Sequence, residues 1–313
     1  MGVLDFFRKA TSPLTRSRAL ADDDLFNDEF QRKLDYLAMV SRRVFTGAMR
    51  AERRTKKTGS GVEFADHRDY APGDDFRYLD WHAYQRFDRL LIRLYEEEED
   101  LSIYFIVDSS SSMAFGDGEK LRQAKRLTAA LAYVGLANLD RIAIVTATDE
   151  ISGRMQSTRG KARIFRIFRF LKDVKADGHT DLGEAMKTFV AQHKRRGLAV
   201  LLTDLYDPAG FERGINVLRY NKFEPFVIHV VDPAEGRPAL RGDVRVYDCE
   251  TGEEREVTVT AKVLARYGAA FEEYLEEAKR FCTARQVSYF RADVNVPFDE
   301  LILRVFRRGG FLR

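Results

Sequence analysis

Short, uninterrupted apolar runs alternate with amphipathic stretches from Leu101 to the end of the chain. The runs are rich in β-branched and aromatic residues, which is typical of strands buried on both faces. We expect strands at Ile103–Val107, Arg141–Ala147, Leu198–Thr203, Pro225–Val231 and Gln286–Ala292. We expect helices at Glu119–Leu139, Lys161–Val174, Leu182–Arg195, Phe211–Tyr220, Ala261–Thr283 and Phe298–Phe306. This alternation predicts an α/β fold: a Rossmann-like, doubly wound and mostly parallel sheet with helices on both faces.

Three parts are expected along the chain. Residues 1–60 are interpreted as an arm and a helix, with the helix at Leu25–Phe45. Residues 61–100 mix arginines, aspartates and aromatics, and they are too few for a core of their own, so we expect them to pack on the main domain. Residues 101–313 form that main domain, with a hairpin inserted near 240–260 and a short edge strand at Ile151–Met155.

Composition excludes several classes of protein. The chain has 313 residues and a formal net charge of +3, which by itself predicts no binding to nucleic acid. The basic segment Arg42–Lys57 lacks interleaved aromatics for base stacking, so we interpret it as a solvated helix end and not as a nucleic-acid or lipid site. No apolar run approaches the length of a membrane span, and no signal peptide is recognised. Two cysteines, Cys249 and Cys282, argue against a disulfide scaffold, although one bridge stays open, and we expect a cytoplasmic protein.

A cluster of oxygen-bearing side chains follows the first buried strand. Asp108, Ser110 and Ser112 give the spacing Asp-x-Ser-x-Ser on the loop after Val107. The carboxyl edge of an open parallel sheet is where such folds bind ligands. Carboxylate and hydroxyl oxygens suit Mg²⁺, Ca²⁺ or Mn²⁺, and not zinc or copper. The alternative is that these residues only cap a helix, because Asp and Ser are favoured at that position.

Two further loops carry the same chemistry. Thr180 lies just before a helix, and Asp204 closes the strand Leu198–Thr203. Because parallel strands end at one edge, these residues should lie beside Asp108, which favours a cation site over coincidence. Alternatives stay open at both loops: Thr180 or Asp181 could be the helix N-cap, and Asp207 competes with Asp204.

This set of residues resembles the metal-ion-dependent adhesion site of the von Willebrand factor A-like domain. The matching residues are Asp108, Ser110, Ser112, Thr180 and Asp204. The resemblance implies that the two serines and the threonine ligate the ion, that the aspartates act largely through water, and that an acidic group of a partner completes the octahedron. Many members of that family have glycine where this chain has Leu205.

The segment before the main domain resembles a second signature, that of the bacterial "domain of unknown function 58" family. The signature runs from Glu63 to Asp75 and continues at Arg77, Asp80-Trp81 and Arg86. The resemblance implies an association with MoxR-type AAA+ ATPases and no established enzymatic activity. On their own, these arginines and aspartates are interpreted either as ion pairs that fasten the segment to the sheet or as a docking surface. An acid–base pair at Asp74 and Asp75 is disfavoured, because neighbouring residues of a strand point to opposite faces.

The leading hypothesis is therefore a protein-interaction module that depends on Mg²⁺ (or Mn²⁺) and works with a MoxR-type ATPase or its client. The alternative is a metal-assisted hydrolase or phosphotransferase that uses Asp108, and a third possibility is a scaffold without a bound ion. No catalytic constellation is recognised, and His179 is interpreted as a loop histidine. The chain has no glycine-rich phosphate loop, so we expect neither ATP nor NAD as a cofactor.

Overall fold

The computed structural model describes residues 25–52, 63–96 and 102–307. They belong to two compact units: one holds the chain up to Ser41 and from Leu101 onward, and the other holds Arg42–Asp100. The side chains of residues 42–52 are not described. The predicted N-terminal arm and the end of the basic segment, Arg53–Lys57, lie outside the described residues. In the described part of the chain, no helix is long and apolar enough to cross a membrane.

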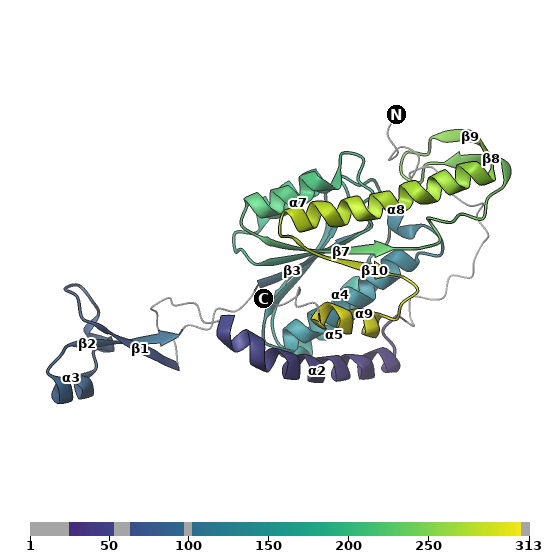
Figure 1. Ribbon diagram of the computed structural model, residues 1–313. Helices are drawn as coiled ribbons and strands as arrows, with labels where there is room; N and C mark the ends of the chain where they lie inside the picture. The colour runs from purple at the N-terminus through teal and green to yellow at the C-terminus, as the bar shows by residue number, and fades with distance from the viewer. Residues whose placement is uncertain (1–24, 53–62, 97–101, 308–313) are drawn as a thin grey trace. The chain divides into compact units, whose positions relative to one another are not determined.

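A six-stranded sheet forms the centre of the larger unit, in the order β10-β7-β6-β3-β4-β5 (Figure 1). Neighbouring strands are parallel except for β5, which runs antiparallel to β4 at the edge. The strands are β3 (Ser102–Asp108), β4 (Arg141–Ala147), β5 (Ile151–Thr158), β6 (Leu198–Thr203), β7 (Glu224–Val231) and β10 (Ser288–Asp293). The predicted α/β fold with a mostly parallel sheet is therefore confirmed.

The central strands are buried because helices cover both faces of the sheet. Every residue of β3 and β6 is buried, which explains their unbroken apolar sequences. One face carries α6 (Leu182–Gln192), α7 (Phe211–Tyr220) and α8 (Ala261–Ala284). The opposite side carries α4 (Glu119–Ala137), α5 (Ile164–Asp173), α9 (Phe298–Arg307) and the beginning of α2 (Asp28–Glu52) (Figure 1).

Aromatic contacts attach the beginning of α2 to the larger unit. Phe30 contacts Phe298 of α9, with ring centroids 4.5 Å apart, and Phe26 stacks on Phe168 of α5 at 4.6 Å. Both phenylalanines of the N-terminal region are buried. The start of α2 and the residue Phe26 before it thus pack in a buried aromatic cluster with α5 and α9.

Between β7 and α8 the chain forms a separate two-stranded hairpin. Its antiparallel strands are β8 (Gly242–Tyr247) and β9 (Glu254–Val259). The turn between them contains Gly252 at φ 70°, a left-handed conformation that glycine adopts without steric cost. The hairpin falls within the insertion that the sequence predicts near 240–260.

The smaller unit contains β1 (Glu63–Asp69) paired antiparallel with β2 (Leu91–Glu96), and a short helix α3 (Trp81–Phe87). Asp80 caps α3 by accepting hydrogen bonds from two backbone N–H groups of its first turn, and it also pairs with His67 and Arg93. Further ion pairs join Arg68 to Asp74, Arg77 to Asp75 and Arg89 to Asp69.

These pairs correct one interpretation of the signature. All of the ion pairs just named join residues of the same unit, so they hold that unit together and do not fasten it to the sheet. Arg68 and Arg77 hold the pKa values of Asp74 and Asp75 below the usual range, so neither carboxyl is suited to donate a proton near neutral pH. The predicted packing of the whole segment on the main domain stays a prediction.

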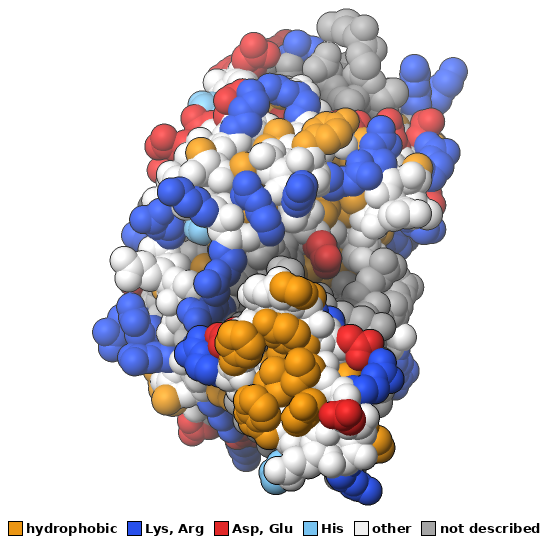
Figure 2. All heavy atoms as spheres, turned by 90° about the vertical axis from the view of Figure 1, so that its left-hand side faces the viewer, with side chains coloured by type: hydrophobic (Ala, Val, Ile, Leu, Met, Phe, Trp, Pro, Cys, Tyr) orange, Lys and Arg blue, Asp and Glu red, His pale blue; other side chains and the backbone are white. Residues whose placement is uncertain are grey.

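Large hydrophobic side chains are exposed on the smaller unit. Figure 2, seen from the side of β1, β2 and α3, shows hydrophobic side chains gathered in one patch on this face. The exposed large hydrophobic residues of this unit are Phe64, Phe76, Trp81, Tyr84, Phe87 and Leu90. An exposed apolar patch of this kind is typical of a contact surface.

Candidate functional site

The first loop is built around Asp108, the last residue of β3. Its Oδ1 accepts hydrogen bonds from the backbone N–H of Ser110 (3.0 Å) and from the Ser110 hydroxyl (2.7 Å). Its Oδ2 accepts a hydrogen bond of 2.5 Å from the hydroxyl of Thr203, which ends β6. Asp108 therefore stabilises its own loop and joins two neighbouring strands. It does not cap α4, which begins at Glu119 after Gly118.

The two serines of this loop lie together. The Oγ atoms of Ser110 and Ser112 are 3.0 Å apart, and both side chains are buried. Ser110 precedes a short 3-10 turn, Ser111–Ala114, but makes no capping hydrogen bond with its side chain. The structure thus brings Asp108, Ser110 and Ser112 together as predicted, in a role other than helix capping.

The second loop lies against the first. Ser111 donates its N–H to the carbonyl of Gly178 (3.1 Å), and Asp177 donates its N–H to the carbonyl of Ser109 (2.8 Å). Asp181 is the N-cap of α6, where it accepts from the N–H of Glu184. Thr180 is therefore not the cap.

The hydroxyl of Thr180 has a different partner. It donates to Glu250 Oε1 at 2.8 Å, and Thr180 is only 2% exposed. His179 is an exposed residue of the same loop. Sequence reasoning missed Glu250, since it lies in the β8–β9 turn, 70 residues away from Thr180.

The third loop brings an unexpected partner for Asp204. Lys120 of α4 donates to Asp204 Oδ2 (2.7 Å) and to Glu235 Oε1 (2.5 Å), and all three side chains are buried. The other oxygen of Asp204 accepts from the N–H of Tyr206 at 3.2 Å. A direct role of Asp204 as a metal ligand would compete with Lys120, so contact through water suits it better.

Asp207, the competing residue, has a structural task. Its carboxylate accepts from the N–H groups of Leu182 (3.0 Å) and Ala209 (2.7 Å), which joins the third loop to the start of α6. Leu205 between the two aspartates has φ 62° and is 1% exposed. The left-handed conformation explains why glycine is suited to this position, and the burial of the leucine side chain offsets its strain.

The buried charges at this edge do not cancel. Asp204 and Glu235 share one buried ammonium group, that of Lys120, and the carboxyl groups of Asp108 and Asp207 are buried in the same loops. Burial and the negative charge of Asp204 raise the pKa of Asp108 to about 7. Burial also raises the pKa of Glu235, although Lys120 opposes that shift. Burial would lower the pKa of Lys120, but the charges of Asp204 and Glu235 raise it above its ordinary value.

A buried histidine supports the third loop without joining this charge cluster. Atom Nε2 of His229 lies 3.0 Å from the carbonyl oxygen of Asp204, and Nδ1 lies 2.8 Å from the hydroxyl of Tyr289. Burial lowers the pKa of His229 to about 4, although Asp204 opposes the shift. The imidazole is therefore neutral at neutral pH and serves to position the loop.

The donor set fits a hard cation better than a soft one. Among the described residues, no three His, Cys, Asp or Glu side chains are placed to hold a metal ion together. The first loop instead presents the hydroxyls of Ser110 and Ser112 beside the Asp108 carboxylate, and the Thr180 hydroxyl of the second loop is bonded to the Glu250 carboxylate. Such oxygen donors match Mg²⁺ or Mn²⁺ and do not match zinc.

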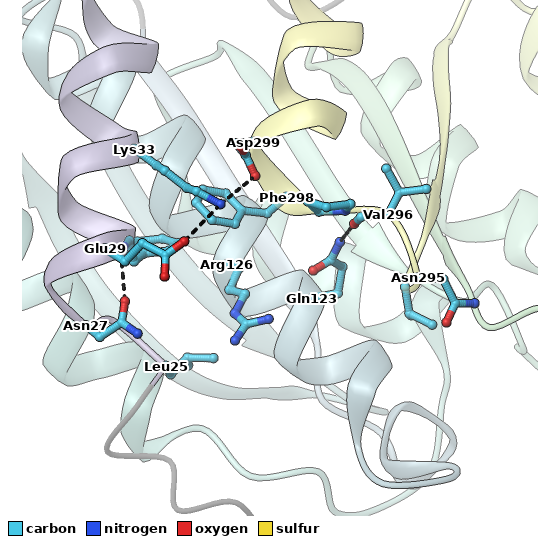
Figure 3. Close-up of a pocket in the computed structure, with 13 residues that line it drawn as sticks. Leu25, Asn27, Glu29, Lys33, Gln123, Arg126, Asn295, Val296, Phe298 and Asp299 are labelled. Carbon is cyan, nitrogen blue, oxygen red and sulfur yellow. Dashed lines mark hydrogen bonds and ion pairs between the residues drawn. The ribbon is translucent and has the colours of Figure 1, made fainter.

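A separate pocket of about 300 Å³ lies between α2, α4 and α9 (Figure 3). Lys33 extends toward Asp299 and Glu29, and Gln123 donates to the carbonyl of Val296 at 2.8 Å. None of the five predicted site residues lines this pocket. It is therefore distinct from the loops at the carboxyl edge of the sheet.

Together these features define an α/β protein with a buried hydroxyl and carboxylate cluster at the carboxyl edge of its parallel strands. The family model described as "Protein of unknown function DUF58" matches residues 66–277, and the chain belongs to this family. The match begins inside the signature segment and extends into α8, so it spans both compact units. The predicted family is confirmed.

The relatives are themselves uncharacterized. An uncharacterized protein of Mycobacterium tuberculosis is 25% identical over 297 residues, which cover 92% of this chain and 93% of that protein. An uncharacterized protein of Mycobacterium avium is 31% identical over 135 residues, which cover 42% of this chain and 79% of that protein.

Similar solved structures have low sequence identity. The conserved hypothetical protein BatB from Bacteroides thetaiotaomicron is 13% identical with a TM-score of 0.41, covering 66% of this chain and 96% of that one. An aerotolerance-related membrane protein from Bacteroides fragilis is 17% identical with a TM-score of 0.38, covering 66% of this chain and 99% of that one.

Proposed function

We propose that this protein is a metal-dependent protein-interaction module with a von Willebrand factor A-like main domain. Mg²⁺ or Mn²⁺ would be held by Ser110, Ser112 and Thr180, with Asp108 and Asp204 acting directly or through water. A carboxylate of a partner would complete the coordination. From the family resemblance, the partner would be a MoxR-type AAA+ ATPase or its client.

The observation that carries this proposal is the excess of buried negative charge. The carboxyl groups of Asp108, Asp204, Asp207 and Glu235 are all buried at this edge, and Lys120 pairs with two of them, Asp204 and Glu235. A buried carboxyl without a compensating charge is costly, and the raised pKa of Asp108 is the sign of that cost. A divalent cation would offset much of this buried negative charge.

The spacing of the hydroxyl oxygens supports the same ion. In an octahedron with metal–oxygen distances of 2.0–2.1 Å, neighbouring ligand oxygens lie about 2.9 Å apart. The Oγ atoms of Ser110 and Ser112 are 3.0 Å apart. Because hydroxyl ligands are neutral, the ion would keep much of its charge and would attract an acidic side chain.

Calorimetric titration with Mg²⁺ and Mn²⁺ tests the proposal. We expect the wild type to bind one ion and Asp108→Ala to lose binding. Asp117→Asn is the control, since it removes one exposed carboxylate from the same region of the chain. Equal binding by the wild type and Asp108→Ala, or no binding by either, would contradict the proposal.

A pull-down from a lysate of the source cells tests the interaction itself. We expect a partner to be retained with Mg²⁺ and released by EDTA or by Ser110→Ala. Equal retention in EDTA would place binding on another surface, such as the exposed aromatic patch of the smaller unit.

The alternative of a hydrolase or phosphotransferase has less support. Both oxygens of Asp108 already accept hydrogen bonds, and a carboxyl group with a pKa of about 7 is partly protonated at neutral pH. Both features weaken it as a nucleophile. Turnover of p-nitrophenyl phosphate that requires Mg²⁺ and disappears in Asp108→Asn would favour the enzyme.

A further inference from the structure

The carboxylate of Glu250 is hydrogen-bonded to Thr180, one of the predicted metal ligands. Glu250 Oε1 accepts from the Thr180 hydroxyl at 2.8 Å, and Oε2 accepts from the Thr180 N–H at 3.2 Å. Both oxygens of one carboxylate are thus directed at one residue. Glu250 is half-buried, and it comes from the hairpin inserted after β7.

The turn of the hairpin is built to present this carboxylate. Asp248 is 4% exposed, and its Oδ1 accepts from the N–H groups of Glu250 (2.9 Å) and Thr251 (3.0 Å). The N–H of Gly252 donates to the Asp248 carbonyl at 2.9 Å. A buried aspartate that fixes the turn holds the Glu250 backbone in place.

The turn also lies near the third loop. Cys249 is exposed as a residue, but partial burial of its thiol raises the pKa of that thiol to about 11. The negative charges of Glu250, Asp248 and Asp204 add to the shift. The turn is therefore within electrostatic reach of both Asp204 and the Thr180 loop.

We propose that Glu250 is the protein's own carboxylate ligand for the cation, and that an acidic partner binds only by displacing it. This inference rests on the proposed function. A threonine hydroxyl can donate its proton to a carboxylate while a lone pair of the same oxygen faces a cation. The distance of 2.8 Å between Thr180 Oγ1 and Glu250 Oε1 is close to the separation of neighbouring ligands in an octahedron, about 2.9 Å.

The consequence is a site that selects its partner. With Glu250 in place, the ion already has an anionic ligand. It would therefore attract a carboxylate that offers no further contacts only weakly. A partner must offer an acidic side chain together with further contacts that offset the loss of the Glu250 bond. The hairpin β8–β9 then moves away from Thr180, and the ion exchanges one carboxylate for another.

The test uses the full chain with Mn²⁺, whose bound waters are counted by water-proton relaxation. The variants are Glu250→Gln and Glu250→Ala, and the control is Glu254→Gln, an exposed glutamate of the same hairpin that pairs with Arg245. We expect both Glu250 variants to bind Mn²⁺ roughly tenfold more weakly, because an anionic ligand is lost. Their bound Mn²⁺ should relax water protons more strongly, because water takes the vacant position.

Acetate supplies a free carboxylate as the second probe. We expect it to lower the relaxation of bound Mn²⁺ in the Glu250 variants at concentrations that leave the wild type and Glu254→Gln unchanged. Wild-type values of affinity, relaxation and acetate response in both Glu250 variants would overturn this inference while leaving the proposed function intact. If the wild type binds no Mn²⁺, or if Asp108→Ala binds it equally well, both this inference and the proposed function are overturned.

Discussion

Lys120 Nζ lies 2.7 Å from Asp204 Oδ2, and neither side chain exposes more than 1% of its surface. The pair joins α4 to the loop after β6, and Glu235 from the loop after β7 completes it at 2.5 Å. Burying an ion pair is costly unless each charge keeps its partner. This cluster therefore sets the stability of the edge that carries the candidate site.

Removing the ammonium group should destabilise the larger unit strongly. We expect Lys120→Met to lower the free energy of unfolding by about 3–5 kcal/mol, because Asp204 and Glu235 would stay buried without a counter-charge. Urea unfolding followed by circular dichroism measures the change. Lys187→Met removes an exposed lysine that pairs with Glu184, and its effect should be far smaller. The double variant Lys120→Met, Glu235→Gln should recover part of the loss, and no recovery would mean that lost packing is the cause.

Stability should depend on pH through His229. Its pKa is about 4 in the folded protein and about 6.5 in the unfolded chain, so between these values the unfolded chain binds a proton that the folded protein does not. The free energy of unfolding should therefore fall as the pH falls from about 6.5 to 4, by up to about 3 kcal/mol. Above that window the contribution of His229 is constant.

The variant His229→Gln isolates this effect, because glutamine keeps a donor for the Asp204 carbonyl and does not titrate. The difference in unfolding free energy between wild type and variant should shrink at acidic pH. A difference that stays constant from neutral to acidic pH would show that His229 titrates normally. Carboxylates that titrate in the same window are shared by both proteins and cancel in the difference.

At Leu205 we expect an unusual order of stability. Its φ of 62° favours glycine by about 1 kcal/mol, while its nearly complete burial contributes about 3 kcal/mol. The burial term is larger, so Leu205→Gly should destabilise the protein. Leu205→Ala should destabilise it more, since alanine loses the burial and keeps the strain. Urea unfolding of the three proteins gives the order, and alanine more stable than glycine would refute the strain argument.

The smaller unit should open locally when its helix cap is removed. Asp80 accepts hydrogen bonds from His82 and Ala83 and pairs with His67 and Arg93, so Asp80→Ala removes all four contacts. We expect faster proteolytic cleavage within residues 63–96 and an unchanged melting temperature of the larger unit. Asp69→Ala, which removes an exposed carboxylate that pairs with Arg89, is the matched control. A lower melting temperature of the whole protein would show that the two units unfold together.

Local sequence patterns predicted the main sheet well, because a buried parallel strand is a continuous apolar run. The run Ile103–Val107 falls within β3, and the edge strand predicted from Ile151 is present as β5. The strands β1 and β2 were not predicted, since this unit shows little regular alternation of apolar residues. Its ion pairs join residues as far apart as Asp69 and Arg89, which local patterns do not reveal.

The same distinction applies to the candidate site. The spacing of Asp108, Ser110 and Ser112 is local, and the structure places these residues together. The partners of Asp204 and Thr180 were missed because Lys120 and Glu250 come from distant elements, α4 and the β8–β9 turn. A buried lysine is also uncommon, and nothing in the local pattern of α4 marks Lys120 as one.

The contacts of α2 have a consequence for the synthesis of the chain. Lys33 pairs with Asp299, which is 266 residues further along the chain, and Phe30 packs on Phe298. At translation rates of about 5–20 residues per second, the apolar face of α2 waits roughly 15–50 s for these partners to leave the ribosome. During that interval Phe30 lacks its contact with Phe298, and the exposed apolar face of α2 offers a binding site for chaperones that act on emerging chains.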